Sequence, residues 1–227
     1  MLSALYYAPQ KAVRETVIIL AHGFTSGKYS LDHTANYLSG RGYPCITFDF
    51  AGHKLGATGG ELREMAETVL QVRAVLDWTQ QNLAQKVVLV GHSMGGAASL
   101  ALTSEMEREG RKLVGIVALC IGENPSQGFA GLIGKAMLDA RADYVAGSPA
   151  RELLTQLDSL VASIPPFHAT PALFIAGKQD VLISVERVAA LAHRVSPHAE
   201  VLALDTTHLE APDKSRSTLL QWLTQHV

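Results

Sequence analysis

The fold is decided by residues 87–96, Val-Val-Leu-Val-Gly-His-Ser-Met-Gly-Gly, in which four apolar residues lead directly into a Gly-x-Ser-x-Gly pattern. Small residues continue the pattern, because Gly96 is followed by Ala97 and Ala98. The stretch predicts a buried strand, a sharp turn at Ser93 and a helix. A strand–turn–helix context of this kind is what a serine nucleophile at the end of a strand requires.

Ser93 is the candidate nucleophile. A serine hydroxyl reacts poorly unless a base takes its proton, and a tight turn can present it to such a base. Side chains at Gly91 and Gly95 would collide with the neighbouring strand and helix. The same turn places the Met94 backbone N–H at the positive end of a helix, where it can stabilise an oxyanion. The alternative is a glycine-rich turn with an incidental serine, and His92 is expected to point away from Ser93 and pack.

Apolar runs recur along the chain, and each is followed by a segment with helical spacing. The expected strands are Thr16–Ala21, Cys45–Phe50, Val87–Val90, Leu113–Leu119, Leu173–Ala176 and Val201–Leu204, with a possible antiparallel edge strand at Ala4–Ala8. The expected helices are Leu31–Ser39, Glu61–Asn82, Met94–Glu109, Val185–Arg194 and Ser215–Thr224. Runs that are apolar on both faces predict strands covered on both sides. The sequence therefore predicts an α/β fold with a mostly parallel central sheet and helices on both faces.

Residues 122–170 interrupt this alternation. They contain no strand-like run but two moderately apolar segments, Phe129–Leu138 and Ala150–Leu160. We expect a short helical cap insertion within one domain spanning residues 1–227, although a pair of ordinary packing helices would give the same pattern. In the cap interpretation the apolar side chains that wall an acyl pocket are Phe129, Leu132, Ile133, Met137, Leu153, Leu154 and Leu157.

Composition narrows the functional classes. The 227 residues include 48% hydrophobic and 18% charged residues, with a formal charge of −2. This balance gives no basic field for nucleic acid. The apolar runs are too short for a membrane span or a signal segment, which predicts a cytoplasmic protein. Neither Cys45 nor Cys120 is part of a CxxC pair or of a Cys/His cluster with zinc spacing in the sequence, and no nucleotide fingerprint occurs, so no cofactor or metal is expected.

Two further loops resemble those of the α/β-hydrolase family. Leu20–Gly27 contains a His-Gly pair after an early strand, and Phe48–His53 is similar to the family's D-x-x-G-H loop, with Lys54 where the family often has glycine. The resemblance implies an α/β-hydrolase fold and a second oxyanion donor, the backbone N–H of Phe24. It also implies that His22 holds its loop by hydrogen bonds and that Asp49 is structural.

The family's chain order is serine, acid, histidine. Residues 177–180 resemble its G-x-x-D turn, which makes Asp180 the candidate acid, and His208 follows the last expected strand as the candidate base. Both fall in loops at the carboxyl edge of a parallel sheet, as Ser93 does. The alternatives are Asp205 for the acid and His168 for the base.

These residues predict a serine hydrolase that cleaves a carboxylic ester of a small to medium acyl or aryl-acyl group through an acyl-enzyme on Ser93. The loop motifs resemble those of small esterases acting on aryl or cinnamoyl esters and of monoacylglycerol lipases. The expected partner is a small-molecule ester. The alternatives are a thioesterase or acyltransferase, a peptidase, and a noncatalytic binding module of the same fold.

Overall fold

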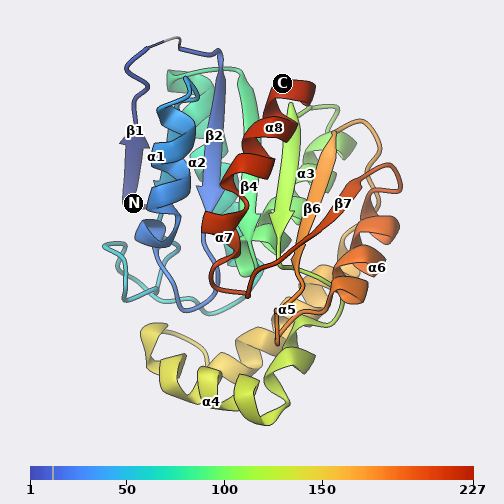
Figure 1. Ribbon diagram of the computed structural model, residues 1–227. Helices are drawn as coiled ribbons and strands as arrows, with labels where there is room; N and C mark the ends of the chain where they lie inside the picture. Colours follow the sequence, from blue (N-terminus) through green and yellow to red (C-terminus); the bar gives the residue numbers. More distant parts are fainter. Residues whose placement is uncertain (12) are drawn as a thin grey trace.

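The computed structural model describes residues 1–11 and 13–227, which form one seven-stranded sheet with the strand order β1-β3-β2-β4-β5-β6-β7. The strands are β1 (Ala4–Tyr7), β2 (Thr16–Ala21), β3 (Cys45–Phe48), β4 (Lys86–His92), β5 (Gly115–Leu119), β6 (Ala172–Gly177) and β7 (Glu200–Leu204). β1 pairs antiparallel with β3, and every other pairing is parallel. The prediction of a mostly parallel sheet with an antiparallel edge strand is confirmed (Figure 1).

Helices cover both faces of the sheet (Figure 1). The helices of the described chain are η1 (Lys28–Leu31), α1 (Asp32–Ser39), α2 (Glu67–Asn82), α3 (Met94–Arg108), η2 (Pro125–Phe129), α4 (Leu132–Arg141), η3 (Ala142–Tyr144), α5 (Ala150–Ser163), α6 (Val185–Val195), α7 (Ala211–Lys214) and α8 (Arg216–His226). Along β2, Ile18 and Leu20 pack with α1 and α8, whereas Val17 and Ile19 pack with the core under α2, α3, α5 and α6. Alternate residues of a strand point to opposite faces, so a two-sided core requires the unbroken apolar runs seen in the sequence.

The helix expected at Glu61–Asn82 begins six residues later, at Glu67. Leu62 and Met65 are buried, as their spacing predicted, but they lie in the preceding loop. The Leu62 backbone N–H donates to Ala146 O at 2.8 Å, and its carbonyl accepts from Ser148 N at 3.0 Å. Long-range backbone bonds thus replace the helical bonds of this segment, and apolar spacing alone does not distinguish the two states.

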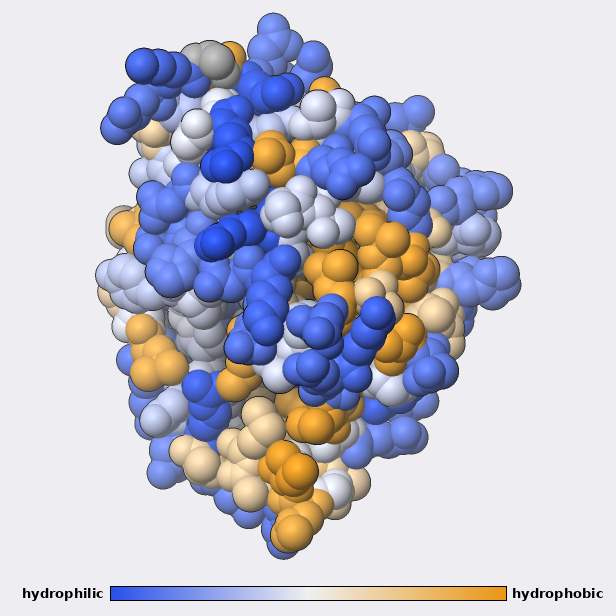
Figure 2. Space-filling model, viewed as in Figure 1, coloured by the Kyte–Doolittle hydropathy of each residue, from blue (hydrophilic) through white to orange (hydrophobic). Residues whose placement is uncertain are grey.

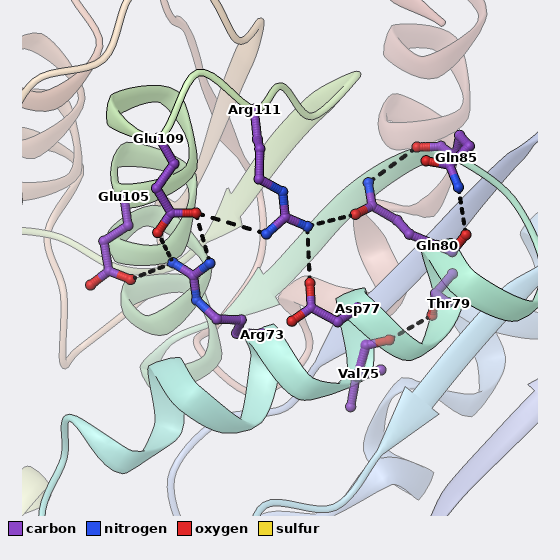
Figure 3. A network of polar contacts seen from close by, with 9 residues as sticks. All are labelled: Arg73, Val75, Asp77, Thr79, Gln80, Gln85, Glu105, Glu109 and Arg111. Carbon is purple, nitrogen blue, oxygen red and sulfur yellow. Dashed lines mark hydrogen bonds and ion pairs between the residues drawn. The ribbon is translucent and has the colours of Figure 1, made fainter.

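α2 and α3 are joined on their outer side by a polar network (Figure 3). Arg73 of α2 donates to Glu105 at 3.0 Å and to both carboxylate oxygens of Glu109, at 2.8 and 3.0 Å. Arg111 donates to Asp77 of α2 at 2.9 Å. Since these side chains are partly exposed, each ion pair adds little to the free energy of unfolding. The network mainly fixes the orientation of α2 relative to α3.

The two helices of residues 122–170 differ in how they pack. α5 buries Leu153, Leu154 and Leu157 in the main core. α4 instead leaves Leu132 87% exposed and Ile133 60% exposed. Figure 2 shows apolar surface gathered at the lower end of the molecule, where Figure 1 places α4. The prediction that Leu132 and Ile133 wall a pocket is wrong, because this side of α4 faces outward.

No helix in residues 1–11 or 13–227 combines the length and the apolar character needed to cross a bilayer.

Because α5 and α4 pack differently, truncating a leucine of α5 and an isoleucine of α4 should lower the free energy of unfolding by different amounts. Leu157→Ala should lower the free energy of unfolding by about 2–5 kcal/mol, because a buried leucine is removed and a cavity remains. Ile133→Ala, the control on α4, should change it by less than about 0.5 kcal/mol. Urea denaturation of both variants measures the difference, and equal costs would show that α5 is not part of the core.

Candidate active site

The turn between β4 and α3 holds Ser93 in a strained backbone conformation. Ser93 has φ 52° and ψ −117°, a positive φ that a residue with a side chain adopts only under constraint. A Cβ on Gly91 would lie 2.3 Å from Gly95 O, and a Cβ on Gly95 would lie 2.4 Å from Ala21 O. Glycine is therefore required at both positions by close backbone approach, as the sequence predicted.

His208 and Asp180 meet at the carboxyl edge of the sheet. His208 Nδ1 lies 2.7 Å from Asp180 Oδ2, and both side chains are buried. The other carboxylate oxygen of Asp180 accepts the backbone N–H groups of Leu182, at 2.8 Å, and Ile183, at 3.0 Å. Burial by itself would raise the pKa of Asp180, but the hydrogen bonds from His208 and the two backbone groups outweigh it and hold that pKa below its usual value. The carboxyl is thus ionised beside the imidazole.

The rival acid and base lie elsewhere. Asp205 is exposed, and its carboxylate accepts a hydrogen bond from Gln179 Nε2 at 2.8 Å. His168 is also exposed and precedes β6, so it lies toward the amino end of that strand, and its backbone N–H donates to Glu107. Neither residue lines the cavity that holds Ser93 and His208.

His22 ties together the loops that follow β2 and β3. The Phe50 backbone N–H donates to His22 Nε2 at 3.1 Å, and His22 Nδ1 lies 2.8 Å from Gly23 O. These contacts fix one tautomer, in which Nδ1 carries the proton and donates to the carbonyl. Burial lowers the pKa of His22 to about 3, so the ring is neutral at ordinary pH. Its position fits the expected loop-holding role and not that of a base.

A buried ion pair also holds these two loops together. Lys28 and Asp49 are 2% and 0% exposed, and their charged groups are in direct contact. Asp49 also accepts the backbone N–H groups of Lys28 and Ala57, each at 2.7 Å. Although burial opposes it, these partners lower the pKa of Asp49. The structural role expected for Asp49 fits these contacts, but Lys28 was missed, because a lone loop lysine normally indicates a solvated charge.

His92 is in contact with the backbone of His208. His92 Nε2 lies 2.9 Å from His208 O, and the two rings are 4.9 Å apart between centroids. Burial lowers the pKa of His92 to about 3, which leaves a neutral ring that donates this hydrogen bond. His92 also lines the cavity beside Ser93, but its hydrogen bond to the His208 backbone fits the structural role expected for it and not that of the base. Sequence adjacency to Ser93 was the available signal, but it does not reveal a partner 116 positions away.

Ser93, His92 and His208 line one cavity of about 330 Å³. Its wall consists of Gly23, Phe24, Thr25, Ser26, Ser30, His92, Ser93, Phe129, Met137, Leu138, Arg141, Leu182, His208, Leu209 and Pro212. Phe129 and Met137 line it as predicted, whereas the predicted lining residues of α5 are in the core. The site is therefore walled by the sheet-edge loops on one side and by η2 and α4 on the other.

Within the described part of the chain, one group of side chains has metal-ligand spacing: Cys120, Asp180 and His208, whose ligand atoms lie within 4.8 Å of one another. Asp180 and His208 already hydrogen bond to each other there. Burial raises the pKa of the Cys120 thiol, which opposes the thiolate that a metal would need. The arrangement fits an acid–base pair better than a metal centre.

Comparison with known proteins agrees with the resemblance to the α/β-hydrolase family. The family model described as "Alpha/beta hydrolase family" matches residues 18–223. A curated relative, the dihydrolipoyllysine-residue acetyltransferase component of the acetoin cleaving system of Pseudomonas putida, is 27% identical over 93% of this chain and 64% of its own length. A putative esterase/lipase of Mycoplasma genitalium is 32% identical over 43% of this chain and 35% of its own length. The chain thus spans less than two thirds of the length of either relative.

Two solved structures have the same fold. Est1E from Butyrivibrio proteoclasticus with bound ferulic acid superposes with a TM-score of 0.76 at 17% identity, over 99% of this chain and 95% of that one. The monoacylglycerol lipase of Paleococcus ferrophilus gives a TM-score of 0.73 at 15% identity over the full length of both chains. At this level of identity the likeness extends to the fold alone.

Buried neutral histidines predict a pH-dependent stability, and His53, whose pKa burial lowers to about 4, adds to the effect of His22 and His92. His22 and His92 regain an ordinary pKa near about 6.5 when the chain unfolds, so below that pH the unfolded state binds more protons than the native state. The free energy of unfolding should be at its full value above about pH 6.5 and fall as the pH decreases toward 3. Urea midpoints between about pH 7.5 and 4.5 test this.

His92→Gln should weaken that dependence by about one proton, because glutamine keeps an N–H donor for His208 O but does not titrate. His193→Gln, on the exposed side of α6, is the matched control. A urea midpoint that stays constant between about pH 7.5 and 5 would contradict neutral buried imidazoles.

Proposed function

Because the chain belongs to the alpha/beta hydrolase family, we propose that it is a serine esterase that cleaves a carboxylic ester through an acyl-enzyme on Ser93. One observation carries the proposal. Ser93, on its strained turn, lines the same cavity as His208, whose Nδ1 is hydrogen bonded to the buried carboxylate of Asp180. Acyl transfer by a serine requires a nucleophile, a base that takes its proton and an acid that orients the base.

The proposed roles follow from the tautomer that Asp180 selects. With the proton on Nδ1 directed at the carboxylate, Nε2 of His208 is the basic nitrogen and takes the Ser93 proton as the hydroxyl attacks the ester carbonyl. The alkoxide part of the ester takes this proton from His208 and leaves as the alcohol. His208 then activates a water molecule, which hydrolyses the acyl-enzyme. Asp180 stabilises the imidazolium formed in each step. The hydrogen bond from His92 to His208 O holds the backbone of the base in place.

The oxyanion would be bound by the backbone N–H groups of Met94 and Phe24. Met94 is the first residue of α3, and the N–H groups of a first helical turn have no acceptor within the helix. Phe24 follows Gly23, where a Cβ would lie 3.4 Å from Ser93 Cβ, so this loop passes directly beside the nucleophile. His22 and the ion pair of Lys28 with Asp49 keep the loop rigid, as preorganised donors require.

The cavity favours a small or medium acyl or aryl-acyl group. Its volume of about 330 Å³ is at the lower end of the usual range for small-molecule sites, which is roughly 300–1,000 Å³. Phe129, Met137 and Leu138 give it an apolar wall. We therefore propose that η2 and α4, within the insertion at residues 122–170, cap the acyl pocket, while α5 anchors the insertion to the core.

One comparison favours a second candidate. The acetyltransferase component of Pseudomonas putida is matched over 93% of this chain. An acyltransferase or thioesterase would form the same acyl-enzyme on Ser93, with a thioester as acyl donor or a thiol as acceptor in place of water. Partitioning of the acyl group between water and added dihydrolipoamide, followed as thioester formation, separates the two functions.

Ser93→Ala should reduce turnover of a 4-nitrophenyl ester by roughly 10³–10⁶-fold, because the nucleophile and the base act as a unit. A serine-directed fluorophosphonate should label the wild-type protein at Ser93 and leave this variant unlabelled. Ser26→Ala removes another hydroxyl from the same cavity and should retain most activity. Full turnover by Ser93→Ala would refute the proposed mechanism. A wild-type protein that neither reacts with the label nor turns over esters would be a noncatalytic binding protein.

Asp180→Asn should lower kcat by roughly 10³–10⁴-fold, since an amide no longer fixes the productive tautomer of His208. Asp205→Asn, which alters an exposed carboxylate on a neighbouring loop, is the matched control and should have little effect. Steady-state kinetics with one ester, together with a melting curve for each variant, makes the comparison. The reverse ranking would assign the acid to Asp205.

A further inference from the structure

Arg141 supplies the cavity's one guanidinium, and the 15 described lining residues include no carboxylate to pair with it. It is the last residue of α4 and is half-buried. Met137 and Leu138 lie four and three positions before it, so one face of the helix carries all three side chains. The same face that provides the apolar wall thus brings a positive charge into the cavity.

Of the ten other arginines in the described chain, nine contact a carboxylate, a backbone carbonyl or a tyrosine ring, and the tenth, Arg108, is exposed. Those that contact a carboxylate within 4.0 Å are Arg63, Arg73, Arg111, Arg151, Arg194 and Arg216. Arg187 donates to backbone carbonyls, and Arg14 and Arg41 lie over tyrosine rings. Arg141 has no such partner among the residues described. A partly buried cation without a counter-charge is unfavourable unless a ligand supplies one.

The helix dipole offers another reason for an arginine at position 141. A cation at the carboxyl end of a helix interacts favourably with the helix dipole, and Arg141 ends α4. Arg108 ends α3 in the same way, is exposed, and does not line the cavity. The two residues therefore share the helix position and differ in whether the guanidinium reaches the site.

We propose that Arg141 is a specificity-determining residue that binds an anionic group, a carboxylate or a phosphate, carried by the substrate at a distance from the scissile bond. The inference rests on the proposed function and narrows its substrate class to esters with an apolar body and one negative charge. Arginine suits this role because its planar fork can make two parallel hydrogen bonds to either oxyanion. The charge belongs to the acyl part or to the alcohol part, and paired substrates distinguish the two.

Two substrate pairs each compare a carboxylate with an uncharged primary amide of similar size. On the acyl side, the mono-4-nitrophenyl ester of adipic acid is compared with the corresponding ester whose far end is a primary amide. On the alcohol side, 4-acetoxybenzoate is compared with 4-acetoxybenzamide. For one pair, wild-type protein should show the higher kcat/KM with the anionic member, and the advantage should shrink as salt is added.

Arg141→Gln should reduce the anionic-to-neutral ratio of kcat/KM for that pair by roughly 10–100-fold, the loss expected for a charge-assisted hydrogen bond. Turnover of the neutral member should change little, since Arg141 does not act on the reacting atoms. Arg141→Lys should give an intermediate ratio, because an ammonium keeps the charge without the fork. Arg108→Gln, the matched control, should leave the ratio unchanged.

Two outcomes overturn the inference while the proposed function survives. One is hydrolysis of both members of both pairs at ratios that Arg141→Gln does not alter. The other is an equal shift in Arg108→Gln, which would indicate a general field effect. Calorimetric binding of 4-hydroxybenzoate, adipate and inorganic phosphate to wild type and Arg141→Gln gives a readout independent of turnover. If no ester is hydrolysed, tighter binding of one of these anions by wild type retains the anion site, and equal binding rejects it.

Discussion

The approach of α3 to the end of β2, made possible by Gly95, is the constraint on which the rest of the site depends. A Cβ at Gly95 would lie 2.4 Å from Ala21 O and 2.6 Å from His22 O, so even alanine would force the helix away from the sheet. This contact sets how tightly the chain turns at Ser93, and the turn forces the positive φ there. It also places the loop after β2 beside Ser93. Backbone strain at one residue and proximity between two loops therefore have a single cause.

Polar groups that take no part in the proposed chemistry hold the surrounding loops. His22 links the loops after β2 and β3, the pair of Lys28 and Asp49 links them again, and His92 supports the backbone of His208. Both histidines are neutral in the native state because burial lowers their pKa values to about 3. Neutral rings make directional hydrogen bonds without adding charge near the cavity. The site can therefore be rigid and still leave Asp180 and Arg141 as its main fixed charges.

The sequence predicted those parts of the fold and site whose signal is local. Strand β2 was predicted at its exact bounds, and the turn at Ser93 follows from glycines within two positions of it. Asp180 and His208 were found because each follows a predicted strand in a short motif, and the structure brings the two together. Features set by distant partners were missed. The first turn of the helix expected from Glu61 does not form, because Leu62 makes backbone hydrogen bonds to residues 146 and 148 instead. The burial of Lys28 depends on Asp49, which lies 21 positions away.

The helices of residues 122–170 show the same limit of sequence-based prediction. The two α-helices there have similar apolar content, yet α5 is packed into the core and α4 lies over the cavity with one side exposed. Apolar spacing predicts that a helix has a buried face but not what that face meets. α4 contributes Leu138 to the core, but its other side chains that line the cavity, Met137 and Arg141, are only partly buried, so they can be exchanged with less effect on the core than those of α5. The charge and shape of this wall of the cavity can thus change while Ser93, His208 and Asp180 on the sheet edge keep their geometry. Arg141, at the end of that face, is where such a change would alter the choice of substrate most directly.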